Sequence, residues 1–389
     1  MIYLDNAAST QIHEDVLNSM LPYLKEQYGN PSSLHRYGRL ARKAIEKSRK
    51  QIASLINAEP SEILLTSGGT ESNNTALKGI AMKNTSGQII TSLIEHDAIL
   101  EPCKKLEQNG FDVDYLPVNE FGMIDSSVLK NHISEKTILV SIMFGNNEVG
   151  TIQTISEISN ICNEHNILFH TDAVQAVGKV HLDVKKLGID LLSISSHKLY
   201  GPKGIGALYI KNGVEVDPVI LGGGQEHGLR SGTENVASIV GFGKACEIAK
   251  NNLNENISHM KKLRDNLVKK VLNEIPEVTL NGHPQSRLPN NAHFTFLGVN
   301  GEDLIIKLDE YGIAASTGSA CSVNTKKASH VLQAMGFSLE QITGSLRLTT
   351  GIFNEQKEID QTVDILKKIV QELRSVSPFK EKYSFVSKN

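Results

Sequence analysis

The chain lacks several features that mark large classes of proteins. It has only four cysteines in 389 residues and no CxxC pair, so the sequence supports neither a disulfide-dependent fold nor a paired-cysteine zinc site. No apolar run reaches about 18 residues, so we expect no membrane-spanning helix. Its 40 basic and 43 acidic side chains nearly balance, which argues against a nucleic-acid-binding surface. The opening MIYLDN does not resemble a secretory signal, and we therefore expect a cytoplasmic protein.

The four cysteines fall into two groups. Cys103, Cys162 and Cys246 lie in segments with a helical pattern, where a free cysteine usually acts as a small buried apolar side chain. Cys321 lies instead in AASTGSACSVNTKKASHV, a small, polar, glycine-containing stretch that predicts a loop. By itself this setting fits an incidental loop thiol as well as a reactive one.

The first two-thirds of the chain alternates short apolar runs with amphipathic ones. Residues 62–67, 88–92, 137–144, 167–173 and 191–195 are short and rich in Ile, Leu or Val, as buried parallel strands are. Residues 39–58, 98–109 and 155–166 have the apolar spacing of helices that cover a sheet. Strands that alternate with helices predict an α/β fold with a mostly parallel sheet.

The pattern changes near residue 250. A long polar helix is predicted up to residue 275, followed by strands at 293–298 and 313–316 and helices at 303–311 and 354–375. We therefore predict a large domain at 13–254 and a smaller α/β domain made of 1–12 and 255–389.

A lysine and a glycine-rich turn follow two of the predicted strands. Lys198 lies in SSHKLYGPKGIGALY, where hydroxyl and imidazole groups precede it and glycines follow. A lysine after a strand is most often a solvated charge, but this setting suits an amine that forms an imine with an aldehyde cofactor. In TSGGTESNN a strand leads through Gly68 and Gly69 into a helix, which can form an anion cradle. The turn matches neither the dinucleotide fingerprint nor a Walker loop.

Polar residues end two further strands. Asp172 follows an apolar strand, where it can cap the next helix or pair with a protonated ring nitrogen, and Gln175 comes three residues later. His96 follows a strand in EHDAI and is either structural or a partner that stacks on a ring. Because ligands of open α/β sheets gather at the strand ends, we expect these groups to meet. A cradle, an amine, a carboxylate and an aromatic ring together suit pyridoxal 5′-phosphate.

The sequence as a whole resembles a known family, the cysteine desulfurases, which are class V, fold-type I pyridoxal-phosphate enzymes. The resemblance rests on YLDNAAST, NPSSLH, TSGGTESNN, EHDAI, GNNEVG, HTDAVQA, SSHKLYGPKGIGALY, RSGTEN, STGSACS and SLRLTTG, which occur in family order from Tyr3 to Gly351. It implies a fold-type I transferase with a large, mostly parallel sheet domain and a smaller α/β domain. It also implies a homodimer that needs neither a membrane nor direct nucleic-acid contact.

The resemblance implies which residues hold the cofactor phosphate. Gly69, Thr70, Ser195 and His197 would bind it from within one subunit. Thr233, in RSGTEN, would reach the phosphate of the other subunit.

The resemblance also implies contacts to the cofactor ring. Lys198 would hold the cofactor covalently, and Asp172 would pair with the pyridine nitrogen. Gln175 would hydrogen-bond the phenolic oxygen, His96 would stack on the ring and assist proton transfer, and Asn147 would contact both cofactor and substrate.

For the substrate, the resemblance implies that Arg347, in SLRLTTG, binds the carboxylate of L-cysteine, for which the planar guanidinium is suited. Lys198 would move the α-proton, and Cys321 would attack the substrate sulfur and become a persulfide as alanine leaves. The sulfur would pass to an acceptor, either an iron–sulfur scaffold protein or a protein of tRNA thiolation. Cys321 would also touch a nascent [2Fe-2S] cluster transiently, as the one metal contact expected.

Two points leave alternatives open. Lys326 and Lys327 stand where the resembled proteins often have an acidic residue and a proline, which could change the choice of acceptor. A selenocysteine lyase or another class V aminotransferase could share the cofactor residues without needing Cys321. A catalytically inactive scaffold would lack the cofactor, and a dinucleotide-dependent oxidoreductase would need a glycine fingerprint that the sequence lacks.

Overall fold

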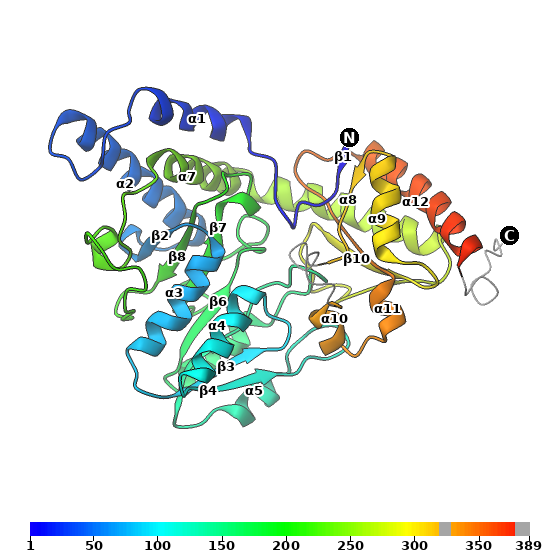
Figure 1. The fold of residues 1–389 in the computed structure, drawn as a ribbon, viewed down its shortest axis with the longest axis horizontal. Helices are drawn as coiled ribbons and strands as arrows, with labels where there is room; N and C mark the ends of the chain where they lie inside the picture. The colour runs from blue at the N-terminus through cyan, green and yellow to red at the C-terminus, as the bar shows by residue number, and fades with distance from the viewer. Residues whose placement is uncertain (319–327, 378–389) are drawn as a thin grey trace.

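The structure is a computed structural model, and it describes residues 1–318 and 328–377 (Figure 1). A seven-stranded sheet dominates the first two-thirds of the chain. Its spatial order is β2-β8-β7-β6-β5-β3-β4. The strands are β2 (Ile63–Thr66), β3 (Gln88–Ser92), β4 (Asp112–Leu116), β5 (Thr137–Ser141), β6 (Leu168–Asp172), β7 (Leu191–Ser195) and β8 (Gly206–Ile210). Strand β8 runs antiparallel to both of its neighbours, β2 and β7, and the other neighbouring pairs are parallel. The predicted α/β class with a mostly parallel sheet is confirmed.

Helices cover both faces of this sheet. They are α1 (Glu14–Lys25), α2 (Arg36–Ile56), α3 (Gly69–Met82), α4 (Asp97–Gln108), α5 (Ser126–His132), α6 (Ile155–Glu164) and α7 (Val236–Asn251). Successive side chains along a strand point to opposite faces of the sheet. Ile89 packs in a core with α3 and α4, whereas the adjacent Ile90 packs in a second core with α2, α6 and α7.

The remainder of the described chain forms a smaller α/β layer. Strand β10 (Asn291–Phe296) pairs antiparallel with β9 (Val278–Leu280) and β12 (Ser345–Thr349), and β1 (Ile2–Tyr3) pairs with β11 (Ile313–Ala314). Helices α8 (Leu253–Glu274), α9 (Gly301–Glu310) and α12 (Gln356–Val376) pack on it, and the short α10 (His330–Ala334) and α11 (Leu339–Thr343) lie nearer the large sheet (Figure 1).

The two ends of the described chain share one apolar core. Ile2 and Leu4 pack with residues of α8, β10, β12 and α12, although more than 250 residues separate them in the sequence. This agrees with grouping residues 1–12 with 255–389, but Leu288 packs in the core of the large sheet. The proposed boundaries at 12/13 and 254/255 remain a prediction.

The predicted long helix near residue 250 is two helices. Helix α7 ends at Asn251 and α8 begins at Leu253, with Asn252 between them. None of the helices in residues 1–318 and 328–377 combines the length and apolar character that a membrane span requires.

Candidate active site

A cavity of about 240 Å³ lies at the carboxyl ends of β2, β3, β5, β6 and β7. Parallel strands direct their following loops to one edge, so residues distant in the sequence meet there. Among the predicted site residues, those that line this cavity are Gly69, Thr70, His96, Asn147, Asp172, Gln175, Ser195, His197, Lys198 and Arg347. The structure thus brings together the lysine, carboxylate, imidazole and glycine turn that the sequence singled out.

Lys198 ends the short 3-10 turn η2 (Ser196–Lys198) that follows β7. Its Nζ donates hydrogen bonds to the carbonyl oxygens of Ala7, at 2.6 Å, and Ala8, at 2.7 Å. These carbonyls belong to residues 3–10, which we call the N-terminal segment. The same segment holds the backbone of His197, because the amide of Thr10 donates to the His197 carbonyl at 2.9 Å. The start of the chain therefore forms one wall of the cavity.

Asp172 is the last residue of β6 and is buried. Its Oδ2 accepts from Asn73 Nδ2 at 2.6 Å, and its Oδ1 accepts from the amide of Val174 at 2.9 Å. The alternative role as a helix cap is wrong, because β6 is followed by turns and no helix begins there in the described chain; the second contact is a bond within that turn, and the first fixes the carboxylate in the cavity. Asn73 was not predicted as a site residue from the sequence, although it lies one helical turn after Gly69 on the cavity side of α3.

The glycine turn before α3 has the form of an anion cradle. Gly68 has φ of +152°, which favours glycine, and no side chain caps the amides that begin α3 at Gly69. A Cβ on Gly69 would lie 2.8 Å from Val174 Cγ2, so a larger residue would crowd this turn. Ser195 and Thr70 supply hydroxyl groups beside it. The donor set therefore fits a phosphate group.

Two histidines at the cavity differ in their setting. Burial, together with nearby Lys198, lowers the pKa of His197 to about 4, so its ring is neutral at physiological pH and can donate from one nitrogen. His197 Nδ1 lies 3.2 Å from Ser9 Oγ. His96 caps α4, and its Nδ1 accepts from the Ala98 amide at 3.0 Å. In the neutral ring this places the proton of His96 on Nε2.

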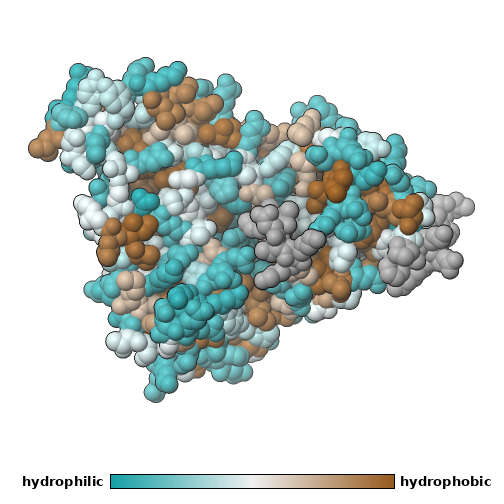
Figure 2. All heavy atoms as spheres, in the orientation of Figure 1, coloured by the Kyte–Doolittle hydropathy of each residue, from teal (hydrophilic) through white to brown (hydrophobic). Residues whose placement is uncertain are grey.

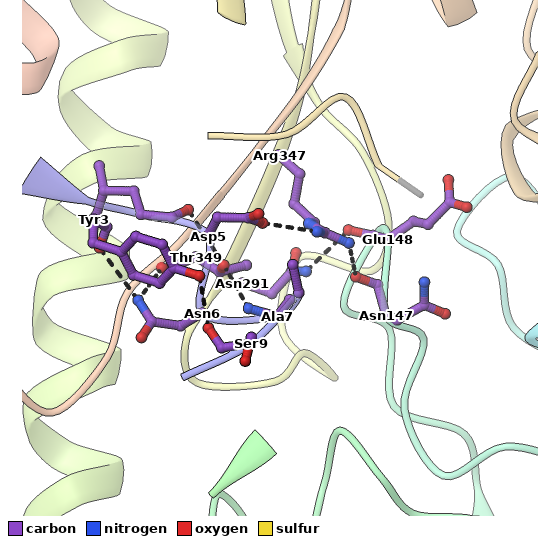
Figure 3. Close-up of polar contacts among 12 residues, drawn as sticks. Tyr3, Asp5, Asn6, Ala7, Ser9, Asn147, Glu148, Asn291, Arg347 and Thr349 are labelled. Atoms are coloured by element: carbon purple, nitrogen blue, oxygen red, sulfur yellow. Dashed lines mark hydrogen bonds and ion pairs between the residues drawn. The ribbon is translucent and has the colours of Figure 1, made fainter. Parts of the chain in front are cut away.

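Arg347, in β12, reaches the cavity from the smaller layer and is only 2% exposed (Figure 3). One terminal nitrogen donates to the carbonyl of Asn147 at 2.9 Å, and the other pairs with Asp5 Oδ1 at 2.9 Å. Its Nε is buried and has no hydrogen-bond partner among the described residues. The ion pair with Asp5 was not predictable from the sequence, because 342 residues separate its members.

Figure 3 also shows how the N-terminal segment is attached beside Arg347. The Asn6 side chain donates to the Thr349 carbonyl at 2.8 Å, and the Ala7 amide donates to the Thr349 hydroxyl at 2.9 Å. The Tyr3 hydroxyl donates back to the Ser9 carbonyl at 2.8 Å, which closes the segment on itself. Asp5 is thus held at a fixed position toward Arg347.

Two predicted site residues are not part of this arrangement. Thr233 lies exposed before α7 and does not line the cavity of its own chain, so its predicted contact to a second subunit remains a prediction. Cys321, with its proposed nucleophilic role and cluster contact, lies outside the described residues.

The other cysteines are buried, as predicted. Burial raises the pKa of Cys103 and of Cys162 to about 12, so neither thiol forms a thiolate near neutral pH. Within residues 1–318 and 328–377, no group of His, Cys, Asp and Glu side chains could hold a metal ion.

Comparisons with known proteins identify the family. The model of the class-V aminotransferases matches residues 2–362. The chain is 48% identical to cysteine desulfurase IscS of Dictyoglomus turgidum over 100% of this chain and 99% of that protein. It is 51% identical to cysteine desulfurase IscS of Methanosarcina thermophila over 98% and 95% of the two chains.

Solved structures agree with this result. A NifS-like protein superimposes with a TM-score of 0.90 at 40% identity, covering 95% of this chain and 99% of that one. A structure described as SspA in complex with cysteine gives a TM-score of 0.81 at 38% identity, covering 91% and 100%. The predicted fold type and the resemblance are confirmed, and the chain belongs to the class-V aminotransferases and, within them, to the cysteine desulfurases.

Proposed function

We propose that this chain uses pyridoxal 5′-phosphate to convert L-cysteine into L-alanine and transfers the sulfur to Cys321. The observation that carries the proposal is the meeting of Lys198, Asp172 and Arg347 in one cavity whose glycine turn suits a phosphate. When bound, pyridoxal 5′-phosphate withdraws electrons from the α-carbon of an amino acid.

The residues of the cavity would hold the cofactor in one orientation. Gly69, Thr70, Ser195 and His197 would bind its phosphate, because amide, hydroxyl and neutral imidazole groups can all donate there. Asp172 would pair with the ring nitrogen, since Asn73 and the Val174 amide already hold its carboxylate in place. Further contacts would come from residues that line the same cavity, namely His96, Asn147 and Gln175.

The substrate would be held and deprotonated by two basic side chains, Arg347 as a cation and Lys198 as a neutral amine. Arg347 would bind the carboxylate of L-cysteine, and Lys198 would anchor the cofactor and then take the proton from the substrate α-carbon. The Cys321 thiolate would attack the substrate sulfur, whose bond to Cβ breaks as Cβ gains a proton. Cysteine plus the Cys321 thiol then give alanine plus a Cys321 persulfide, so the atoms balance without an external oxidant.

Incubation with L-cysteine tests this proposal. We expect alanine and one added sulfur on Cys321 by mass spectrometry. Lys198→Ala should abolish both products, and Cys321→Ser should abolish persulfide while the protein still takes up the cofactor. Cys103→Ser is the matched control, because that thiol is buried and should change neither product. A protein that takes up no pyridoxal phosphate would contradict the proposal.

Selenocysteine lyase activity is the alternative for the same cavity. Its test is the Cys321→Ser variant supplied with selenocysteine and with cysteine in parallel. If sulfide or selenide release from both substrates is unchanged in this variant, the loop thiol is not needed and the lyase assignment replaces ours.

The persulfide would be delivered to an iron–sulfur scaffold protein or a protein of tRNA thiolation, as a desulfurase named IscS among the relatives suggests. Transfer of radiolabelled sulfur from Cys321 to a candidate acceptor would identify which. A transient [2Fe-2S] contact at Cys321 belongs to the same proposal and predicts that Cys321→Ser slows cluster formation on the scaffold.

We also propose that the chain works as a homodimer in which Thr233 reaches the partner's phosphate. Exposed apolar side chains that a partner could cover lie on α1, on the start of α2 and between the two helices; they are Leu17, Leu24, Leu34 and Leu40. Brown spheres gather in this part of the surface in Figure 2. Light scattering tests the oligomeric state. Thr233→Ala should weaken cofactor binding only in the dimer.

A further inference from the structure

A second lysine lies behind the cavity, and the proposed mechanism does not use it. Lys179 follows β6 in the turn after Gln175 and is only 1% exposed. Its Nζ donates to the Gln175 backbone carbonyl at 3.2 Å and lies 3.5 Å from the Gln175 side-chain Oε1. No carboxylate forms an ion pair with it in the described part of the chain.

A buried lysine in this position lowers the stability of the fold. Burial, with a smaller contribution from the charge of Lys198, lowers the pKa of Lys179 to about 7. Lys198, His13 and Tyr200 line the same small void, which has no acidic side chain. An apolar side chain would fill the space without the desolvation penalty of an amine. Packing therefore does not explain why a lysine is present at position 179.

The contacts of Lys179 lead to the cavity through Gln175. The amide Oε1 of Gln175 faces Lys179, and its Nε2 donates to the Ala7 carbonyl at 2.9 Å. The same carbonyl accepts from Lys198 Nζ at 2.6 Å. A carbonyl can only accept, so the Ala7 carbonyl holds Nε2 on its side, and the hydrogen bond that Lys179 donates to Oε1 favours the same orientation of the amide.

The fixed amide has a consequence in the cavity. Gln175 lines it, and its Nε2 carries a second hydrogen beyond the one given to Ala7. With Oε1 held by Lys179, the group that the amide can offer a ligand is an N–H donor. A flipped amide would instead present an acceptor, which repels an oxygen anion.

We propose that Lys179 is a positioning residue, which acts through Gln175 by holding the amide so that its N–H₂ group faces an anionic oxygen of the bound cofactor. This rests on the proposed function, in which Gln175 meets the phenolic oxygen of pyridoxal 5′-phosphate. Lys179 can donate in either protonation state, so the role holds on both sides of neutral pH.

The test is a double-mutant cycle read from the absorption spectrum of bound pyridoxal 5′-phosphate, followed against pH without substrate. A donor to the phenolic oxygen favours its deprotonated form and lowers the pKa of the spectral transition. Lys179→Met should raise that measured pKa by about 0.5 to 1, and Gln175→Ala should raise it as well. In the Gln175→Ala background, Lys179→Met should have no further effect.

Controls separate this role from a structural one. Lys186→Met removes an exposed lysine seven residues further on and should leave the transition unchanged. Lys179→Arg keeps a donor and should restore most of the shift. If Lys179→Met does not fold, Lys179→Leu gives the same test, because leucine also lacks a hydrogen-bond donor.

The outcomes are distinct. Equal shifts from Lys179→Met in both backgrounds, or no shift in either, overturn the inference while leaving the proposed function intact. A wild-type protein that shows no cofactor absorption overturns the proposed function, and the inference falls with it.

Discussion

Glu95 provides a stringent test of the electrostatics beneath the cavity. It lies just beyond β3 and is fully buried. Its Oε1 accepts from Ser92 Oγ at 2.7 Å and from the Met143 amide at 2.9 Å, and its Oε2 has no partner among the described residues. Burial, opposed by these two hydrogen bonds and assisted by the charge of Asp172, raises its pKa from 4.5 to about 8.

The sign of the effect on stability follows from proton binding. Between about pH 4.5 and pH 8 the unfolded chain has released the Glu95 proton while the folded chain keeps it. Unfolding releases a proton in this window, so this group makes the free energy of unfolding fall as pH rises. A pKa difference of this size lowers the free energy of unfolding by about 5 kcal/mol once the pH exceeds both pKa values.

The perturbation is Glu95→Gln, which keeps the shape and the Oε1 acceptor but cannot ionise. The stability of this variant relative to the wild type should therefore rise by about 3–5 kcal/mol between about pH 5 and about pH 8.5. Urea unfolding followed by circular dichroism measures it, since the chain has no tryptophan for fluorescence. An exposed glutamate gives the matched control, Glu101→Gln, for which we expect no such trend. Parallel pH profiles for Glu95→Gln and wild type would refute the argument.

Three further substitutions test the site and the fold. Asp5→Asn removes the charge beside Arg347 but keeps an acceptor, so the KM for L-cysteine should fall about fivefold with kcat unchanged; a higher KM would contradict the assigned role of the arginine. Asn73→Ala removes a hydrogen bond to the Asp172 carboxylate that contributes about 2 kcal/mol to holding this group in place. The variant should lose bound pyridoxal phosphate at least tenfold faster on dialysis, as measured by absorbance. Phe294→Ala, in the core of the smaller layer, should lower the free energy of unfolding by about 3–5 kcal/mol in urea titrations, and a loss below 1 kcal/mol would show that this core is loosely packed.

Local patterns predicted most of the central sheet. The strands at 88–92 and 191–195 have the observed bounds, because continuous Ile and Leu runs are buried on both faces. Strand β4 was missed because Asp112 and Asp114 alternate with apolar residues at the edge of the sheet, where one side is only partly buried. Strand β8 was missed because it begins at Gly206, where a Cβ would lie 2.7 Å from Gly68 Cα.

The site was predictable as a set of residues and not as a set of contacts. Asp172 ends a recognisable strand, and Lys198 and His96 closely follow two others, so a shared edge followed from the topology. The acceptors of Lys198, the carbonyls of Ala7 and Ala8, have no signature in the sequence, since any residue has a carbonyl. Such pairings form only when distant segments fold together.

The attachment of the N-terminal segment sets the order in which the enzyme can mature. The N-terminal segment is held in part by a strand that is translated much later, as the bond from Asn6 to the Thr349 carbonyl, 343 residues further on, shows. During synthesis, the cavity therefore lacks Arg347, and the N-terminal segment lacks its bonds to Thr349, until β12 has been translated. A nascent or truncated chain without β12 has an incomplete cavity, which delays the appearance of activity until that strand has been made.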